Sequence, residues 1–197
     1  NVLEIGCAYG FFGEVMLNEF PGSEYTGIDI ARDAVEHGKN QLGLELVCGD
    51  YLNHQFPGLF SDIFMLDVIE HLERPDLYLE KAYQELKPGG RIFITTGDIS
   101  RLIPRIKKQN WRLIHPPTHL HYFSRETLFK LLQAKGFIIA GILYPSITRS
   151  MKLAWYSAFM LDKKPGRFTT GIHRAIPHKM KFTMNTFDIM FVAAIRE

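Results

Sequence analysis

Short apolar runs alternate with stretches of helical periodicity along the first 144 residues of the chain. Apolar side chains at helical spacing predict helices at 11–20, 31–42, 75–86 and 124–135. The apolar runs between them predict strands at 2–5, 25–28, 44–48, 61–67, 91–96 and 137–143. Strands that alternate with helices of this length are typical of an α/β protein with a parallel, doubly wound sheet.

Turn and cap residues mark several element ends. Lys87-Pro88-Gly89-Gly90 is a strong turn signal, and Pro75 suits the first turn of a helix. Ser124 is a predicted N-cap, and Gly136 a predicted C-terminal cap.

The regular alternation lapses in two segments. Residues 97–123 read as irregular, and residues 145–186 show no clean strand pattern, with one helix expected at 151–161. The apolar run 187–195 predicts a last strand. We therefore expect a single domain over 1–197, with 97–123 and 145–186 as substrate-side loop and insertion.

Composition adds three expectations. No apolar run approaches the roughly 18 residues of a membrane span, and no secretory signal pattern opens the chain. The two cysteines, Cys7 and Cys48, indicate no disulfide framework and favour a reduced, cytoplasmic setting. The chain starts directly on a strand without Met, so we expect further residues before Asn1.

The net charge of +2 hides an asymmetry. Residues 1–144 hold 14 Lys and Arg against 18 Asp and Glu, a net −4, whereas residues 145–197 hold 9 against 3, a net +6. An acidic body is not the footprint of a nucleic-acid-binding protein. The apolar, aromatic and basic segment 145–186 is compatible with a substrate lid, a dimer contact or a membrane-surface contact, so a monomer and a homodimer both stay open.

Acidic side chains end three successive predicted strands, where ligands of open α/β sheets bind. Asp29 lies 19 residues past Gly10, where a carboxylate accepts bonds from ribose hydroxyls. Asp50 could accept from an exocyclic amine such as that of adenine, and Asp67 ends the next strand. Each is also a residue type that commonly forms turns or caps.

The opening stretch NVLEIGCAYG narrows the choice of ligand. A buried strand breaks into a glycine loop, and the helix behind it offers free N–H groups. The dinucleotide fingerprint fails, because its three glycine positions hold Gly6, Ala8 and Phe11, and no GK[ST] phosphate loop is present. Glu4 would repel a pyrophosphate but suits a ligand with an ammonium and a sulfonium. This favours S-adenosyl-L-methionine (SAM).

With these motifs the chain resembles the class I SAM-dependent methyltransferases. The matching motifs are E-x-G-x-x-x-G at 4–10, Asp29, Gly49-Asp50, DVIEHL at 67–72 and LKPGG at 86–90. It is similar in particular to the bacterial ubiquinone-biosynthesis O-methyltransferases, also through W-x-x-x-H-P-P-T-H-L-H-Y-F-S at 111–124. The resemblance implies a Rossmann-like seven-stranded sheet, mostly parallel with an antiparallel last strand, preceded by N-terminal helices that this chain lacks. It departs from the family at Ala8, which replaces the usual middle glycine.

The resemblance also implies the cofactor residues, with S-adenosylhomocysteine as product. The glycine loop would line the methionine part, Asp29 would bind the ribose, Asp50 and Tyr51 would flank the adenine, and Asp67 and Val68 would lie beneath the methyl donor. The full predicted set is Glu4, Gly6, Cys7, Ala8, Tyr9, Gly10, Asp29, Ile30, Gly49, Asp50, Tyr51, Asp67 and Val68.

Methyl transfer needs alignment, and a hydroxyl acceptor also benefits from a base. His71, just after the fourth strand, and His119 are the candidates. His119 lies in a loop whose aromatic residues Trp111, Tyr122 and Phe123 could wall an aromatic acceptor.

The spacing of His115, His119 and His121 can support a metal, but zinc sites usually have a fuller ligand set. Pro116-Pro117 also indicates a shaped loop, so we predict no metal site.

The sequence therefore predicts a methyltransferase that moves a methyl group from SAM to a small-molecule acceptor, preferably at oxygen. An RNA or protein methyltransferase is the alternative enzyme. DVIE stands where the N/D-P-P-F/Y signature of base amino methylation would follow the fourth strand, which disfavours nucleic acid. A non-catalytic SAM-binding module is the third reading.

Overall fold

The computed structural model describes residues 1–161 and 166–197. The chain divides into two compact units, one of Asn1–Leu143 with Asp188–Glu197 and one of Tyr144–Phe187. The segment expected to be an insertion at 145–186 thus coincides with the second unit to within a residue at each end.

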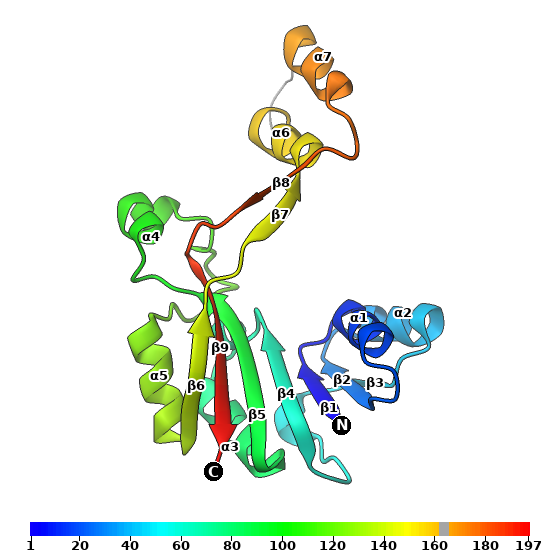
Figure 1. Cartoon of the computed structure of the whole chain (residues 1–197), viewed down its shortest axis with the longest axis vertical. Helices are drawn as coiled ribbons and strands as arrows, with labels where there is room; N and C mark the ends of the chain where they lie inside the picture. The colour runs from blue at the N-terminus through cyan, green and yellow to red at the C-terminus, as the bar shows by residue number, and fades with distance from the viewer. Residues whose placement is uncertain (162–165) are drawn as a thin grey trace. The chain divides into compact units, whose positions relative to one another are not determined.

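The first unit is built on a seven-stranded sheet in the order β3-β2-β1-β4-β5-β9-β6 (Figure 1). Its strands are β1 (Val2–Ile5), β2 (Tyr25–Asp29), β3 (Leu46–Cys48), β4 (Phe60–Leu66), β5 (Leu86–Gly97), β6 (Phe137–Leu143) and β9 (Ile189–Arg196). The pairs from β3 to β5 are parallel, and β9 is antiparallel to both of its neighbours. This confirms the predicted mostly parallel sheet with an antiparallel last strand.

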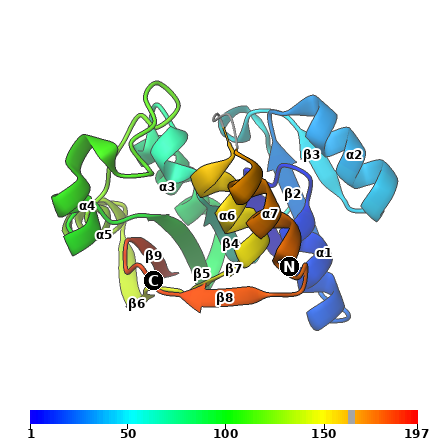
Figure 2. The ribbon, with the colours of Figure 1, turned by 90° about the horizontal axis from the view of Figure 1, so that it is seen from above.

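Helices cover both faces of this sheet (Figure 2), with α1 and α2 on one side and α3 and α5 on the other. The α-helices of the first unit are α1 (Phe11–Glu19), α2 (Arg32–Leu42), α3 (Pro75–Glu85), α4 (Leu102–Lys107) and α5 (Arg125–Ala134). Short 3₁₀ turns form η1 (Tyr51–Asn53), η2 (Ile69–His71) and η3 (Lys108–Asn110).

Two groups of buried side chains hold the first unit together. Strands and the helices α3 and α5 contribute completely buried aliphatic residues, among them Leu3, Ile63, Ile92, Leu79 and Leu128. A second cluster joins α1 and α2 to β1–β3 through Val2, Cys7, Met16, Tyr25, Val35, Leu44 and Leu46. Burial of such side chains, at about 1.5–3 kcal/mol each, is what fixes the strand ends in place.

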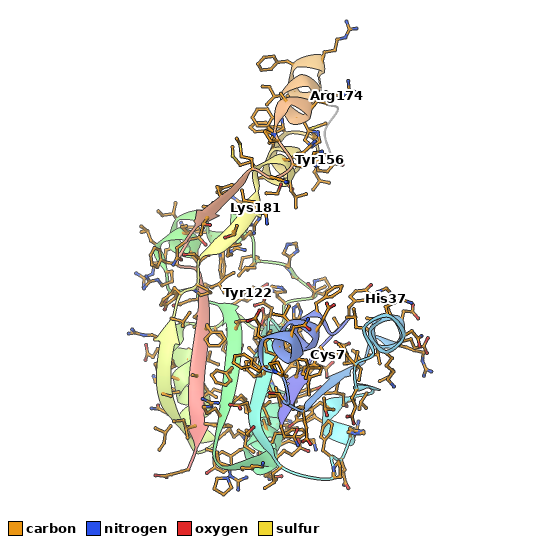
Figure 3. All side chains as sticks on the ribbon, turned by 45° about the vertical axis from the view of Figure 1, so that its right-hand side comes forward. Cys7, His37, Tyr122, Tyr156, Arg174 and Lys181 are labelled. Carbon is orange, nitrogen blue, oxygen red and sulfur yellow. The ribbon has the colours of Figure 1, made fainter. Side chains whose placement is uncertain are left out.

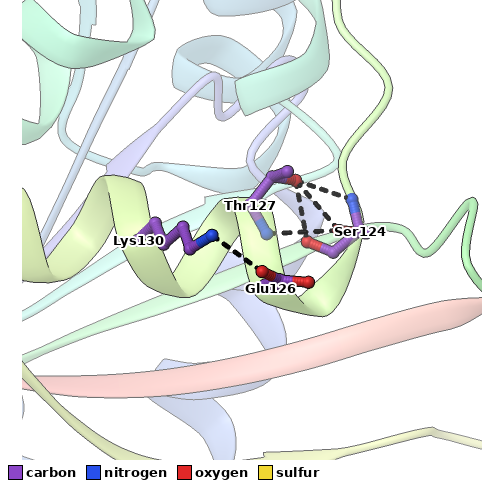
Figure 4. Close-up of polar contacts among 4 residues, drawn as sticks. All are labelled: Ser124, Glu126, Thr127 and Lys130. Atoms are coloured by element: carbon purple, nitrogen blue, oxygen red, sulfur yellow. Dashed lines mark hydrogen bonds and ion pairs between the residues drawn. The ribbon is translucent and has the colours of Figure 1, made fainter.

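The start of α5 shows why the sequence signal there was reliable (Figure 4). The Ser124 hydroxyl accepts from the Thr127 amide at 3.1 Å, and the Thr127 hydroxyl accepts from the Ser124 amide at 2.8 Å. Glu126 and Lys130 form an ion pair one turn apart, at 2.7 Å. Gly136 follows the helix with φ +89°, so both predicted caps are confirmed.

The prediction that 97–123 is wholly irregular is wrong, since α4 and η3 lie inside it. Pro104 does not interrupt α4, because it lies in the first turn, where its missing N–H would have no intrahelical partner. The turn predicted at 87–90 lies inside β5, where the pairing with β4 changes register. Phe60 pairs with Leu86, but Asp62, two residues later, pairs with Arg91.

The second unit contains a hairpin of β7 (Ile147–Ser150) and β8 (Lys181–Met184), with α6 (Met151–Phe159) and α7 (Arg167–Ala175) between its strands. The helix expected at 151–161 is confirmed as α6, but the hairpin and α7 were not predicted. Each strand has only four residues, so the alternation that places Phe182 and Met184 on one face of β8 is too short to predict a strand. On the other face, Thr148 and Thr183 bond across the pair at 2.8 Å. None of the helices in 1–161 and 166–197 is long and apolar enough to cross a membrane.

Candidate active site

A cavity of about 440 Å³ opens where β1, β2, β3 and β4 end. Nine of the predicted site residues line it: Gly6, Ala8, Asp29, Ile30, Gly49, Tyr51, Asp67, Val68 and His71. Its size lies within the range of small-molecule sites. The structure thus brings together residues that are 65 positions apart in the sequence.

The glycine loop reaches the cavity because its backbone is left-handed. Gly6, Ala8 and Gly10 have φ values of +77°, +45° and +80°. A Cβ added at Gly6 would lie 2.4 Å from a methyl carbon of Val68, so only glycine lets the loop approach the end of β4 this closely. Ala8 adopts the same left-handed region without being glycine, which costs about 1–2 kcal/mol.

Asp29 joins the end of β2 to this loop. One carboxylate oxygen accepts from the Ala8 amide and the other from the Ala31 amide, both at 2.8 Å. Asp29 is therefore a turn-forming residue and a wall of the cavity at the same time.

Asp67 is fixed in a similar way at the end of β4. Its amide donates to the Thr95 hydroxyl at 2.8 Å, and that hydroxyl donates to the Asp67 carboxylate at 2.8 Å. The cavity lining thus holds two carboxylates and no lysine or arginine. This charge favours a cationic ligand over a phosphate.

Two tyrosines form the wall beside β3. Tyr51 and Tyr78 have ring centroids 5.5 Å apart, and both line the cavity. The Tyr78 hydroxyl donates to Asp50 at 2.9 Å, and burial raises its pKa to about 12. Tyr78 was not predicted, because an aromatic residue in the first turns of a helix carries no functional signal of its own.

Apolar contacts to the cavity were missed for a similar reason. Ile5, Ile28, Leu66 and Leu72 also line it. In the sequence these residues could not be told from core residues, since strand ends are apolar in both cases.

Asp50 is placed differently from the prediction. Its carboxylate is the N-cap of η1, accepting from the Leu52 amide at 3.1 Å and from Asn53 at 2.7 Å as well as from Tyr78. Asp50 is not among the residues that line the cavity, whereas its hydrogen-bond donor Tyr78 is. Its predicted adenine contact stays a prediction, which Tyr78 on the cavity wall now shares.

Glu4 lies behind the glycine loop and is not among the residues that line the cavity. It is only 4% exposed, and its carboxylate accepts a hydrogen bond from the Tyr25 hydroxyl rather than facing the cavity. The reason is strand alternation: Glu4 lies on the face of Val2, which pairs with Tyr25. Burial raises the Glu4 pKa from its usual 4.5 to about 7, partly opposed by the Tyr25 bond.

Three loop residues support the loop rather than the cavity. Cys7 is buried under α1 (Figure 3) against Gly27, where a Cβ would lie 2.8 Å from the Cys7 sulfur. Tyr9 stacks on Phe11 at 5.7 Å and meets the edge of His37 at 5.4 Å. Gly10 is the N-cap of α1. The predicted direct cofactor contacts of Cys7, Tyr9 and Gly10 are thus not supported by the lining.

The two candidate bases lie together but not equivalently. His71 lines the cavity, and its Nδ1 is 2.7 Å from the Thr118 carbonyl oxygen. His119 lies next to it, with ring centroids 4.5 Å apart and planes at 86°, and lines a much smaller pocket together with Tyr122. Figure 3 places Tyr122 near the carboxyl end of β5.

The histidine set considered in the sequence is not the one that the fold assembles. Within the described ranges, the group whose ligand atoms could meet at one ion is Glu70, His71 and His119, all within 4.8 Å of one another. His115 and His121 are not part of it. The two candidate bases thus lie beside the buried acid Glu70, which precedes His71 in the DVIEHL motif.

Comparison with known proteins places this site in a family. A family model described as "Methyltransferase domain" matches residues 1–140. The chain is 31% identical over 104 residues to a ubiquinone biosynthesis O-methyltransferase of Idiomarina loihiensis, covering 49% of this chain and 42% of that protein. It is 31% identical over 147 residues to malonyl-[acyl-carrier protein] O-methyltransferase 2 of Ilyobacter polytropus, covering 72% and 56%. The chain thus spans about half the length of these two curated relatives.

Solved structures agree at the level of the fold. The N-methyltransferase NodS from Bradyrhizobium japonicum, in complex with S-adenosyl-l-homocysteine, aligns with a TM-score of 0.58 at 17% identity, over 100% of this chain and 77% of that one. The family model, which matches residues 1–140, shows that the chain belongs to the methyltransferase-domain family. Its sheet order, glycine loop and acidic strand ends are those of a class I SAM-dependent methyltransferase domain.

The residues present fit SAM. A carboxylate-lined cavity without basic side chains suits a sulfonium with an ammonium, and the Gly6–Val68 contact lets main-chain atoms form the wall. Asp29 and the loop at Ala8 would hold the ribose and methionine parts, with Tyr51 and Tyr78 on the adenine side.

Proposed function

We propose that this chain is the catalytic domain of an enzyme that transfers a methyl group from SAM to a small-molecule acceptor, at oxygen. SAM supplies a methyl carbon that is already activated on a positively charged sulfur. The chain's own residues bind the donor, orient the acceptor and remove its proton. The observation that carries the proposal is that His71 shares the lining of a cavity otherwise suited to a cation.

An oxygen acceptor is supported by the chemistry of the site. A hydroxyl must lose a proton as it is methylated, and a neutral imidazole at the cavity is a suitable base. Both relatives named above are O-methyltransferases by name, one acting in ubiquinone biosynthesis and one on a malonyl-acyl-carrier protein. These names support oxygen but leave the acceptor itself open.

Binding measurements separate the donor from the reaction. Calorimetry with SAM and S-adenosylhomocysteine should give binding to the wild-type chain, weakened about tenfold or more in Asp29→Asn. Asp33→Asn, an exposed carboxylate in the first turn of α2, is the matched control. Absence of binding by a folded wild-type protein would refute the proposed function.

The alternatives predict different results. A non-catalytic SAM-binding module would bind SAM without methylating any member of an acceptor panel that includes phenols and carboxylic acids. An RNA or protein methyltransferase would transfer label from SAM to those polymers instead.

The second unit favours a surface role beside this activity. Residues 144–187 hold eight Lys and Arg and one Asp, a net charge of +7. Within the described part of the unit, exposed apolar side chains gather on the two helices, with Leu153, Tyr156 and Phe159 on α6 and Phe168 on α7. Apolar residues beside basic ones suit the surface of an anionic membrane.

We propose that this unit brings the enzyme to a membrane-bound acceptor. In sedimentation with vesicles that contain an anionic phospholipid, the wild type should pellet with the vesicles. The double variant Phe168→Ser/Arg174→Gln should stay in the supernatant. Retention that is equal on neutral vesicles, or equal in the variant, would contradict this. A substrate lid or a homodimer contact is the competing role, and light scattering with and without vesicles tests the dimer.

A further inference from the structure

The Tyr51 ring on the cavity wall is held by a side chain that lies outside the cavity. Tyr51 is the first residue of η1, lines the cavity and is only 2% exposed. Its hydroxyl donates to the Glu85 carboxylate at 2.7 Å. Glu85 is not among the residues that line the cavity, and its side chain is 14% exposed. A largely buried carboxylate at the end of α3, 34 residues further along the chain, therefore fixes part of the wall.

Lys81 supports this contact from the same helix. Its ammonium lies 2.6 Å from the Glu85 carboxylate and 5.1 Å from the centroid of the Tyr51 ring. Tyr78, Lys81 and Glu85 follow one another at spacings of three and four residues, so they lie along one face of α3. A cation over an aromatic ring is attracted to the ring face. Lys81 thus contacts both the ring and the carboxylate that accepts its hydrogen bond.

The Tyr51 hydroxyl depends on this acceptor because it is buried. Burial, followed by the charge of Glu85, raises the pKa of Tyr51, so the phenol keeps the hydrogen that it donates. A buried hydroxyl that loses its acceptor carries a free-energy cost, which a turn of the side chain toward another acceptor can relieve. Removal of the Glu85 carboxylate should therefore displace the ring.

The second tyrosine of the wall is held in the same manner. The Tyr78 hydroxyl donates to Asp50 at 2.9 Å. A phenol has a single hydrogen to donate, so neither Tyr51 nor Tyr78 has one left for a ligand. The wall therefore offers ring surfaces in fixed positions, which suits a flat heteroaromatic base.

On the basis of the proposed function, we propose that Glu85 is a positioning residue for SAM, which holds the Tyr51 ring where it packs against the adenine. Lys81 keeps the Glu85 carboxylate in place. Both act through the ring, since neither lines the cavity. A ring that is already held needs no ordering when the ligand binds, and the ordering of one side chain weakens binding by about three- to tenfold.

Calorimetry with SAM on the full chain tests the proposal. Glu85→Leu removes the acceptor and should raise the Kd for SAM by about three- to tenfold. Glu85→Gln keeps an oxygen that accepts from Tyr51, so it should restore the affinity even though the ion pair with Lys81 is lost. Glu80→Leu is the matched control, because Glu80 lies on the same helix and pairs with Lys135 at 2.8 Å, away from the wall. It should leave the Kd unchanged.

A double variant separates this role from a general loss of structure. In a chain that carries Tyr51→Phe, no hydroxyl at this position needs an acceptor. Adding Glu85→Leu to that chain should therefore change the Kd for SAM by less than about twofold. Equal losses of affinity with and without Tyr51→Phe would overturn the proposal, and so would equal losses in Glu85→Leu and Glu80→Leu.

Aromatic NMR of the wild type tests the same proposal without any variant that has to fold. The Tyr51 ring should be ordered both before and after SAM is added, and a ring that becomes ordered only with SAM would overturn the role of Glu85. A folded wild type that does not bind SAM would refute the proposed function together with this role. Binding of SAM with equal losses in both backgrounds would refute the role of Glu85 alone.

Discussion

The buried Glu4–Tyr25 pair should make the free energy of unfolding depend on pH by an amount that can be worked out. The Glu4 pKa rises from its usual 4.5 in the unfolded chain to about 7 in the folded one, chiefly through burial. Between these values the folded chain binds more protons than the unfolded chain, so the free energy of unfolding falls as the pH rises. Full ionisation therefore costs about 3 kcal/mol, at 1.36 kcal/mol per pKa unit.

Glu4→Gln removes this cost while it keeps an oxygen that accepts from Tyr25. At pH 4 the variant and the wild type should unfold with similar free energies, since Glu4 is then protonated. At pH 8 the variant should be more stable by about 3 kcal/mol. Contributions from all other groups are common to both proteins and cancel in the difference.

Urea unfolding followed by circular dichroism at pH 4, 6 and 8 measures that difference directly. Glu24→Gln is the matched control, an exposed carboxylate beside Tyr25 in the sequence, and should show a pH-independent difference from wild type. A Glu4→Gln difference that stays constant from pH 4 to pH 8 would refute the reasoning. So would a variant that is less stable than the wild type at pH 8.

Three further predictions follow from individual contacts. Gly6→Ala should lower the free energy of unfolding by about 1–2 kcal/mol because of its left-handed φ alone, and it should also weaken SAM binding. Adding Val68→Ala should recover part of both losses, because it removes the 2.4 Å clash with the new Cβ. Unfolding and calorimetry of the single and double variants check this. Ser124→Ala should cost about 1 kcal/mol in thermal or urea unfolding through loss of the α5 cap, and no loss would contradict the capping role. Tyr78→Phe should weaken SAM binding less than tenfold, because the ring remains and only the bond to Asp50 is lost. Tyr78→Ala should weaken SAM binding more, because it also removes the ring. Equal effects of the two variants in calorimetry would show that the ring does not contribute.

The local features of the fold, such as the ends of helices, could be predicted from the sequence. Ser124 and Gly136 predicted the two ends of α5, because caps depend on neighbouring main-chain atoms. The alternation of strands and helices predicted the sheet. Asp29 and Gly6 were expected at one edge of it, and both line the cavity there, because the ends of parallel strands meet at one edge. The β7–β8 hairpin was not predicted, because each strand has only four residues and so short an alternation of apolar and polar positions is not distinctive.

What the tertiary structure alone decided is which of these residues faces the ligand. Glu4 carries the family motif, but the alternation of β1 and the position of Tyr25 turn its carboxylate into the protein and raise its pKa. Tyr78 enters the cavity from a helix, and Glu70 is tied to a loop that lies 50 residues later. A sequence determines which chemical groups are available at an edge of the sheet. Their orientation depends on hydrogen bonds and packing between distant segments, which only the folded chain brings together.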